Sequence, residues 1–211
     1  MSSRTVPTPY AARSTLAAQR YQTLLLFGAP GSGKGTQGKA LGSVPRFFHC
    51  ACGDVFRSLD TRTELGQAFL DYSSRGELVP AELTIQLWQV QIENAVEAHR
   101  FKPDLDYLVL DGIPRSVEQA RAMKGLIEVK KVFHLTCPDR RELVVRLKKR
   151  ALKDNRLDDA NESVIRTRLD TYEAESKPVL DYYGPDLVQT IDATQPPAKV
   201  LLEILQTVTA F

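Results

Sequence analysis

Cysteine, tryptophan and methionine are scarce in this chain of 211 residues, which holds three, one and two of them. The cysteines (Cys50, Cys52 and Cys137) do not make a disulfide framework, and an odd number suits a reducing compartment such as the cytoplasm. No apolar run approaches the ~20 residues of a membrane span. A formal net charge of +2 gives no reason to expect a nucleic-acid-binding surface. These features predict a cytoplasmic protein with neither a membrane nor a nucleic acid as its partner.

Acidic residues are absent from the first twenty positions, which are rich in arginine, serine and threonine. This composition resembles an organellar transit segment, but it lacks the apolar core of a secretory signal. Pro7 and Pro9 argue against regular structure there. We expect residues 1–21 to form a loose N-terminal arm. An organellar protein with a transit segment in residues 1–20 is the alternative.

Short continuous apolar runs bounded by turn residues predict buried strands. These runs cover residues 23–27, 107–111 and 131–137, with a weaker run at 187–192. Helical patterns fill the intervals and cover residues 34–42, 81–100, 116–124, 139–152, 161–182 and 197–209. Strands that alternate with helices predict the α/β class, with a parallel sheet covered by helices on both faces. Two segments break the alternation: residues 50–80 show helical signals without a strand, and residues 150–158 are typical of a polar, mobile loop.

The segment FGAPGSGKGTQ, residues 27–37, places a glycine-rich loop between the first strand and the first helix. Gly28, Gly33 and Lys34 match the phosphate-loop pattern G-x-x-x-x-G-K. Glycines let backbone N–H groups approach an anion closely, and the start of the following helix attracts negative charge. We expect Lys34 to reach the β- and γ-phosphates, whereas the usual hydroxyl after the lysine is displaced by one position, to Thr36. The loop predicts a nucleoside triphosphate site, and the lack of an N-K-x-D run argues against a GTPase.

Five motifs link this loop to an acceptor site: GAPGSGKGTQ, CGDVFR, GELVP, DGIPRSVEQ and NRLDD. In order and spacing the chain resembles the adenylate kinase family of nucleoside monophosphate kinases, over about residues 22–209. The resemblance implies a phosphate-loop kinase core (22–50, 81–149 and 159–211), a small helical lobe for the nucleoside monophosphate (51–80) and a short lid (150–158). The lid lacks the insertion and the four cysteines of zinc-binding members, so we expect no zinc. We also expect a monomer.

The reaction that the resemblance implies is ATP + AMP ⇌ ADP + ADP, with Mg²⁺ bound to ATP. The attacking group is a phosphate oxygen that is already anionic near pH 7, so no general base is needed. Catalysis then depends on positioning and on neutralising charge in a loose transition state. The resemblance assigns this catalytic role to Lys34, Arg115, Arg150, Arg156 and Arg168.

The other site residues are implied by the same resemblance. The ATP-binding set is Gly31, Ser32, Gly33, Lys34, Gly35, Thr36, Arg146, Arg150 and Gln195. The AMP-binding set is Cys52, Arg57, Glu77, Leu78, Val79, Gly112, Arg115, Gln119, Arg156 and Arg168. We expect Asp111 to hold Mg²⁺ through a water ligand, and Asp158 and Asp159 to tie the closed lid by pairing with arginines.

The identity of the acceptor base stays open at this point. Gln119 matches the family position that reads the adenine edge, and its amide offers the donor and the acceptor that adenine needs. Cys52 departs from the family pattern, because a thiol, which is a weak hydrogen-bond former, replaces the usual threonine hydroxyl. AMP is the expected acceptor, and a UMP/CMP kinase or a broad-specificity kinase is the alternative. A nucleotide-sensing protein with weak catalysis is the alternative from another class, although the arginine set argues against it.

Overall fold

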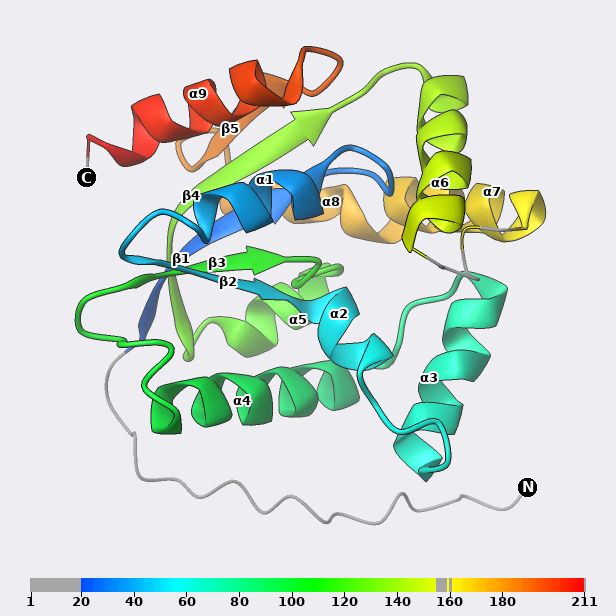
Figure 1. The fold of residues 1–211 in the computed structure, drawn as a ribbon, viewed down its shortest axis with the longest axis horizontal. Helices are drawn as coiled ribbons and strands as arrows, with labels where there is room; N and C mark the ends of the chain where they lie inside the picture. The colour runs from blue at the N-terminus through cyan, green and yellow to red at the C-terminus, as the bar shows by residue number, and fades with distance from the viewer. Residues whose placement is uncertain (1–19, 155–158, 160, 211) are drawn as a thin grey trace.

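Parallel strands form one five-stranded sheet in the order β2-β3-β1-β4-β5 in the computed structural model of the protein (Figure 1). The structure describes residues 20–154, 159 and 161–210. The strands are β1 (Tyr21–Phe27), β2 (Phe47–Ala51), β3 (Tyr107–Asp111), β4 (Ile127–Thr136) and β5 (Val188–Asp192). Every neighbouring pair runs parallel, which confirms the expected α/β class.

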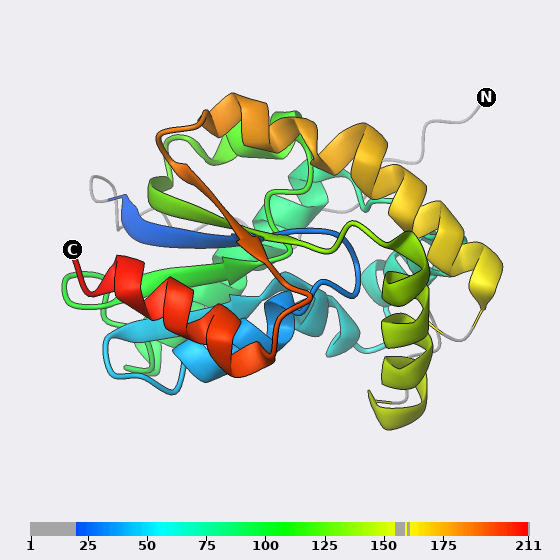
Figure 2. The same cartoon turned by 90° about the horizontal axis from the view of Figure 1, so that it is seen from above.

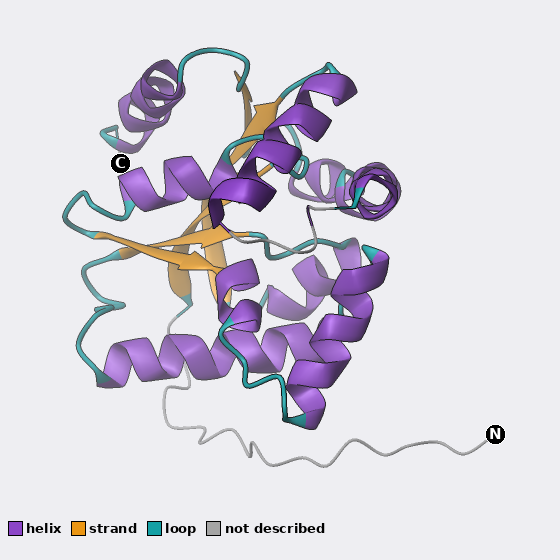
Figure 3. Ribbon diagram, turned by 45° about the vertical axis from the view of Figure 1, so that its right-hand side comes forward, coloured by secondary structure: helices purple, strands orange, loops and turns teal. Residues whose placement is uncertain are grey.

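Helices cover both faces of this sheet (Figure 2, Figure 3). They are α1 (Lys34–Leu41), α2 (Cys52–Arg57), α3 (Glu64–Arg75), α4 (Ala81–Glu97), α5 (Val117–Met123), α6 (Arg140–Asp154), α7 (Glu162–Thr171), α8 (Pro178–Tyr183) and α9 (Pro197–Val208). A π-helical segment, Tyr172–Ser176, joins α7 to α8. Helices α1 and α9 pack on one face, whereas α4, α5 and α8 pack on the other. No helix in the described part of the chain is long and apolar enough to cross a membrane.

The central strand β1 shows why the sheet needs cover on both sides. Leu24 and Leu26 pack toward α1 and α9, and Leu25 and Phe27 pack toward α4 and α5. Successive side chains of a strand point to opposite faces, so an uninterrupted apolar run is stable only when both faces are buried. Burial of each such side chain contributes about 2 kcal/mol. The loop that follows β1 therefore starts from a rigid base.

Strand β2 is absent from the sequence prediction, which places no strand in residues 50–80. The strand ends at Ala51 and lies at the edge of the sheet, so the prediction is wrong for residues 50–51. Only Cys50 in this strand is fully buried. The polar ring of His49 also interrupts the apolar run that would otherwise reveal a buried strand.

Several boundaries differ from the prediction. Strand β1 begins at Tyr21, so the expected arm of residues 1–21 is wrong at that residue, and helix α4 ends at Glu97 instead of residue 100. Strand β4 begins at Ile127 because its first half pairs with β1 through a register shift between Thr23 and Leu24, and its charged side chains hide it from an apolar pattern. The single helix expected at 161–182 is divided by the π-helical segment. Helix α6 continues to Asp154, so residues 150–154 of the expected lid loop are helical. Their side chains, alanine, leucine and lysine among them, are good helix formers.

Helices α6 and α7 stand together beside the carboxyl end of the sheet (Figure 1). A small apolar cluster of Leu143 and Leu147 from α6 with Ile165 and Leu169 from α7 holds them against each other. Residues 1–19 of the expected N-terminal arm lie outside the described residues, as do Arg156 and Asp158.

Candidate active site

The carboxyl ends of β1, β3 and β2 bring three of the sequence motifs to one edge of the sheet. In the strand register Leu26 of β1 pairs with Asp111 of β3, and Asp111 pairs with Ala51 of β2. The glycine loop, the DGIPR segment and the CGDVFR segment therefore begin side by side. They line a cleft of about 850 Å³, in a position where α/β sheets bind ligands.

Nearly all of the expected binding residues that the structure describes line this one cleft, although they come from distant parts of the chain. They are Gly31, Ser32, Gly33, Lys34, Gly35, Thr36, Cys52, Arg57, Glu77, Leu78, Val79, Asp111, Gly112, Arg115, Gln119, Arg146, Arg150, Arg168 and Gln195. Asp159 does not line the cleft and lies buried behind its arginines. The assignment to a single site is thus consistent with the geometry.

Gly28, Gly31 and Gly33 of the loop hold positive φ angles that other residues rarely adopt. Gly28 has φ 143°, and a Cβ at this position would lie 2.4 Å from the carbonyl oxygen of Leu135. Gly33, with φ 99°, is the N-cap residue of α1 and offers no side chain to cap the helix. The first N–H groups of α1 consequently face the cleft without a side-chain acceptor, which is the arrangement that binds an anion.

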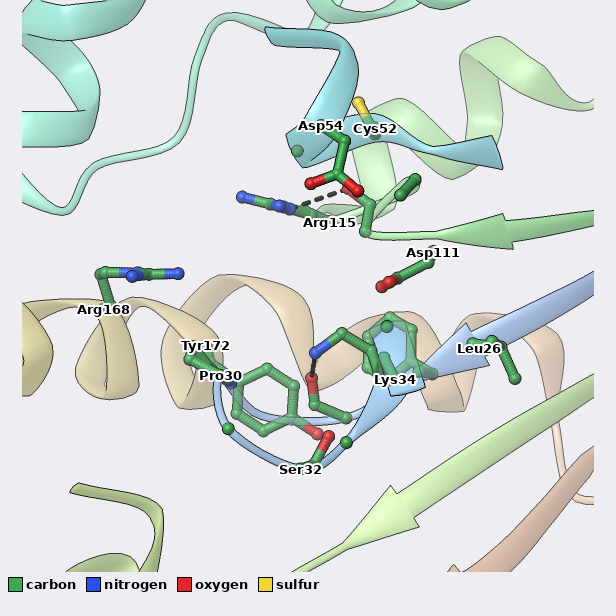
Figure 4. Close-up of a pocket in the computed structure, with 18 of the residues that line it drawn as sticks. Leu26, Pro30, Ser32, Lys34, Cys52, Asp54, Asp111, Arg115, Arg168 and Tyr172 are labelled. Atoms are coloured by element: carbon green, nitrogen blue, oxygen red, sulfur yellow. Dashed lines mark hydrogen bonds between the residues drawn. The ribbon is translucent and has the colours of Figure 1, made fainter. Parts of the chain in front are cut away.

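Lys34 extends from the start of α1 toward the space bounded by Asp111, Arg115 and Arg168 (Figure 4). Its Nζ donates to the carbonyl oxygens of Gly28 at 2.7 Å and Ala29 at 3.1 Å. Burial lowers the pKa of Lys34 to about 8, and the nearby Asp111 carboxylate offsets part of this effect. The charge is therefore held at some cost in free energy, in a position where an anionic ligand would repay it.

The wall of the cleft formed by α2 and the segment after β3 presents two arginines held by short local contacts. Arg57 forms an ion pair with Asp54, one turn earlier on α2. Arg115 donates from Nε to the carbonyl oxygen of Gly112 at 2.8 Å. Its backbone N–H donates to Oε1 of Gln119 at 2.7 Å. Both guanidinium groups line the cleft, and planar guanidinium groups can bind two phosphate oxygens at once.

Asp159 joins two further arginines that come from different helices. It is fully buried and forms ion pairs with Arg150 of α6 and Arg168 of α7. The distance from Arg150 Nη2 to Asp159 Oδ2 is 2.6 Å. The carboxylate therefore bridges α6 and α7. That Asp159 ties a closed lid through these pairs stays a prediction.

The wall of the cleft formed by α2, α3 and the segment before α4 carries apolar side chains. Leu78 and Val79 line it together with Phe56 and Phe69, whose rings stack at 5.1 Å. Cys52 is 3% exposed, and burial raises the pKa of its thiol to about 11, so it lies in the pocket as a neutral thiol. Glu77 forms an ion pair with Arg75.

The opposite end of the cleft lies between α6 and the start of α9. Arg146 donates from Nη1 to the carbonyl oxygen of Ala193 at 2.9 Å and pairs with Glu142. Gln195 donates from Nε2 to Glu203 at 2.6 Å. Arg146 and Arg150 both reach the cleft from one face of α6, as a spacing of four residues predicts.

Asp111 is the acid best placed to meet a metal ion carried by a phosphate ligand. Its carboxylate lies beside the start of α1, where a Cβ on Gly35 would be 3.5 Å from Oδ2. The described residues contain no cluster of three or more metal-ligating side chains. A single carboxylate fits Mg²⁺, which keeps several waters and binds through few protein ligands.

The sequence analysis missed Tyr172 and Phe69 among the residues that line the cleft. Tyr172 is buried against Phe27, with ring centroids 6.0 Å apart, and its hydroxyl contacts His134 Nε2 at 3.1 Å. It lies four residues after Arg168, so helical spacing from that arginine would have predicted a place on the same face. Phe69 has no comparable signal.

The sheet order, the glycine loop and the cleft of converging cations define a phosphate-loop nucleotide kinase. Comparison with known proteins narrows the class. A family model described as adenylate kinase matches residues 26–187. The chain is 38% identical over 188 residues to an adenylate kinase of Cyanothece sp., covering 86% of this chain and 92% of that protein. It is 39% identical over 176 residues to an adenylate kinase of Mycolicibacterium vanbaalenii, covering 81% and 90%.

A third relative, an adenylate kinase of Corynebacterium urealyticum, is 37% identical over 164 residues, covering 76% of this chain and 84% of that protein. The chain belongs to the adenylate kinase family.

Proposed function

We propose that this protein transfers a phosphoryl group reversibly from ATP to AMP and forms two molecules of ADP. The observation that carries the proposal is the convergence of cations from four elements on one cleft. Lys34 comes from α1, Arg115 from the segment after β3, Arg150 from α6 and Arg168 from α7. A phosphoryl group in transit spreads negative charge over its oxygens, and such an array stabilises that charge.

The same geometry supports a mechanism without a general base. No histidine lines the cleft in the part of the chain that the structure describes. The acceptor phosphate brings its own anionic oxygen, so the protein must bring two phosphates together and exclude water. Positioning of two reactants alone supplies several kcal/mol of the barrier reduction. Arg57 and Arg115 would hold the acceptor phosphate, and Lys34 would follow the group that moves.

Mg²⁺ belongs to the proposal as part of the donor nucleotide. Asp111 would hold the ion through a water ligand, at the edge where the first N–H groups of α1 meet the phosphates. When bound, the cation neutralises charge on the β- and γ-phosphates. Asp111 would orient the nucleotide through this shell of water.

Closure of two segments over the substrates would exclude water. The lobe of residues 51–80 would close on the acceptor and the lid of residues 150–158 on the donor, with the rest of the described chain as a rigid core. Arg156 and Asp158 would take part in the lid, as the family motif implies. Water exclusion matters because ATP would otherwise be hydrolysed.

The base pocket favours AMP, and a second candidate acceptor rests on Cys52. The Gln119 oxygen already accepts from the Arg115 backbone, which fixes the amide and leaves its nitrogen as a donor to the base. The thiol of Cys52 offers little hydrogen bonding where a threonine hydroxyl is usual. This weakens discrimination, so UMP or CMP is the second candidate.

A parallel acceptor assay tests the proposal. ATP·Mg²⁺ is offered with AMP, UMP, CMP or GMP at equal concentrations, and nucleoside diphosphate formation is followed by a coupled assay. The expected order places AMP first. Preference for UMP would overturn the argument from Gln119. Absence of turnover with every acceptor would overturn the enzyme assignment in favour of a nucleotide-sensing protein.

A further inference from the structure

His49 is a buried polar residue to which the proposed mechanism gives no role. It lies on β2, and its side chain is 11% exposed. Its Nε2 is buried and has no hydrogen-bond partner among the described residues. A buried nitrogen without a partner destabilises the fold, so the position of this ring calls for a reason other than stability.

Two glycines of α1 create the space that the ring occupies. A Cβ on Gly38 would lie 2.2 Å from His49 Nε2, and a Cβ on Gly42 would lie 2.7 Å from His49 Cβ. Gly38 and Gly42 are one helical turn apart, so together they leave a groove on the side of α1 that faces the sheet. The ring is thus held between β2 and the helix that carries Lys34.

The unpartnered nitrogen of His49 is directed toward Asp111. The distance from Nε2 to Asp111 Oδ2 is 4.0 Å, about 1 Å longer than a hydrogen bond. His49 pairs with Val109 in the register of β2 and β3, and Val109 packs toward α1. Asp111, two residues further along β3, points to the same face. The carboxylate therefore lies between the imidazole and the start of α1 at Gly35.

We propose that His49 is a positioning residue for Asp111: its Nε2–H donates to one carboxylate oxygen and aims the other at the water shell of the nucleotide-bound Mg²⁺. The inference rests on the proposed function, because it requires a magnesium nucleotide in the cleft. Partners of this kind orient the groups around a metal, and contacts that are long without ligand shorten when the ligand binds.

The test compares His49→Leu with His49→Gln by isothermal titration calorimetry. Leucine fills the groove without a donor, whereas the glutamine amide places an N–H near the position of Nε2. The dissociation constant of a non-hydrolysable ATP analogue is measured with Mg²⁺ and with EDTA. We expect Mg²⁺ to improve the affinity for the analogue about tenfold less in the leucine variant than in the wild type. The affinity measured in EDTA should be the same for both proteins. The glutamine variant should recover most of the loss.

Equal weakening with Mg²⁺ and with EDTA would overturn the proposal, because it would show that His49 only packs α1 against the sheet. His49→Met, whose flexible side chain fits irregular space, gives the same comparison if the leucine variant does not fold.

Asp111→Asn separates this inference from the proposed function. If Asp111→Asn retains the full Mg²⁺-dependent gain, the proposed role of Asp111 fails, and the inference fails with it. If Asp111→Asn loses the gain, His49→Leu added to Asp111→Asn should cause no further loss. A further loss would show that His49 acts by another route, while the role of Asp111 would stand.

Discussion

Replacement of Lys34 by methionine should make the ligand-free protein more stable near pH 7 while abolishing its activity. The pKa of Lys34 falls from 10.5 to about 8 in the folded chain, mainly through burial. A shift of about 2.5 units corresponds to about 3 kcal/mol at 1.36 kcal/mol per unit. Lys34 keeps partial exposure to the cleft and loses two hydrogen bonds on replacement. We therefore expect a net gain of about 1–2 kcal/mol.

The pH dependence gives the sharper test. Between about pH 8 and pH 10.5 the unfolded wild type binds the Lys34 proton and the folded wild type does not, so its stability rises with pH. The variant lacks this group. The difference in free energy of unfolding between the variant and the wild type should shrink by about 2 kcal/mol between pH 7 and pH 9.5. The upper pH lies about 1.5 units above the folded pKa, and each unit contributes about 1.36 kcal/mol.

Urea denaturation measures both quantities. Trp88 is the single tryptophan and is 1% exposed, so its fluorescence reports unfolding. Other groups that titrate in this range are common to both proteins and cancel in the difference. Lys39→Met, an exposed change on the same helix, is the control and should shift stability by less than about 0.5 kcal/mol. If the difference in free energy of unfolding between Lys34→Met and the wild type stays constant from pH 7 to pH 9.5, the claim that burial lowers the pKa of Lys34 is refuted.

Three further predictions concern the arginines, the base pocket and the buried acid. Arg115→Ala should lower kcat/KM by about 10²–10³-fold. The control is Arg62→Ala, which changes an arginine 88% exposed on the lobe and should alter kcat/KM by less than about twofold. Equal effects of the two substitutions on steady-state rates would contradict the contact between Arg115 and phosphate. Cys52→Thr should raise the ratio of kcat/KM for AMP over UMP by about 2- to 10-fold, the worth of one hydrogen bond; an unchanged ratio would make Cys52 a bystander. Asp159→Asn should lower the free energy of unfolding by on the order of 2 kcal/mol, less than for a fully buried pair because its two arginines remain partly exposed; an unchanged urea midpoint would show that the ion pairs contribute nothing.

Strands buried on both faces were predictable, whereas of the two edge strands β5 was predicted, at residues 187–192, and β2 was not. The run at residues 107–111 matches β3 residue for residue, because burial on both faces requires an unbroken apolar sequence. β2 escaped prediction because an edge strand needs less burial, and His49 interrupts its apolar pattern. Helix α6 was predicted too short, since a polar and basic sequence cannot by itself distinguish a loop from the exposed end of a helix.

The candidate site divides in the same way between local and distant information. The glycine loop and Lys34 were predictable, since positive φ at Gly28 and Gly33 and the following helix start are encoded within one short segment. The burial of Asp159 between two helices was not, because it depends on how α6 packs against α7. Phe69 was missed for the same reason, whereas Tyr172 had a local signal, its spacing of four residues from Arg168.

The amino-acid sequence by itself determined the fold class, the phosphate loop and the types of side chain available for phosphate and base. These properties follow from local periodicity and from residue chemistry, which need no knowledge of distant contacts. The sequence already placed Asp111 near the loop, but only the tertiary structure decided that His49 lies beside Asp111, because the register of the parallel strands β2 and β3 makes them neighbours. It also decided that the arginines share one cleft. Side chains far apart in the chain meet only where packing of the sheet and its helices brings them together.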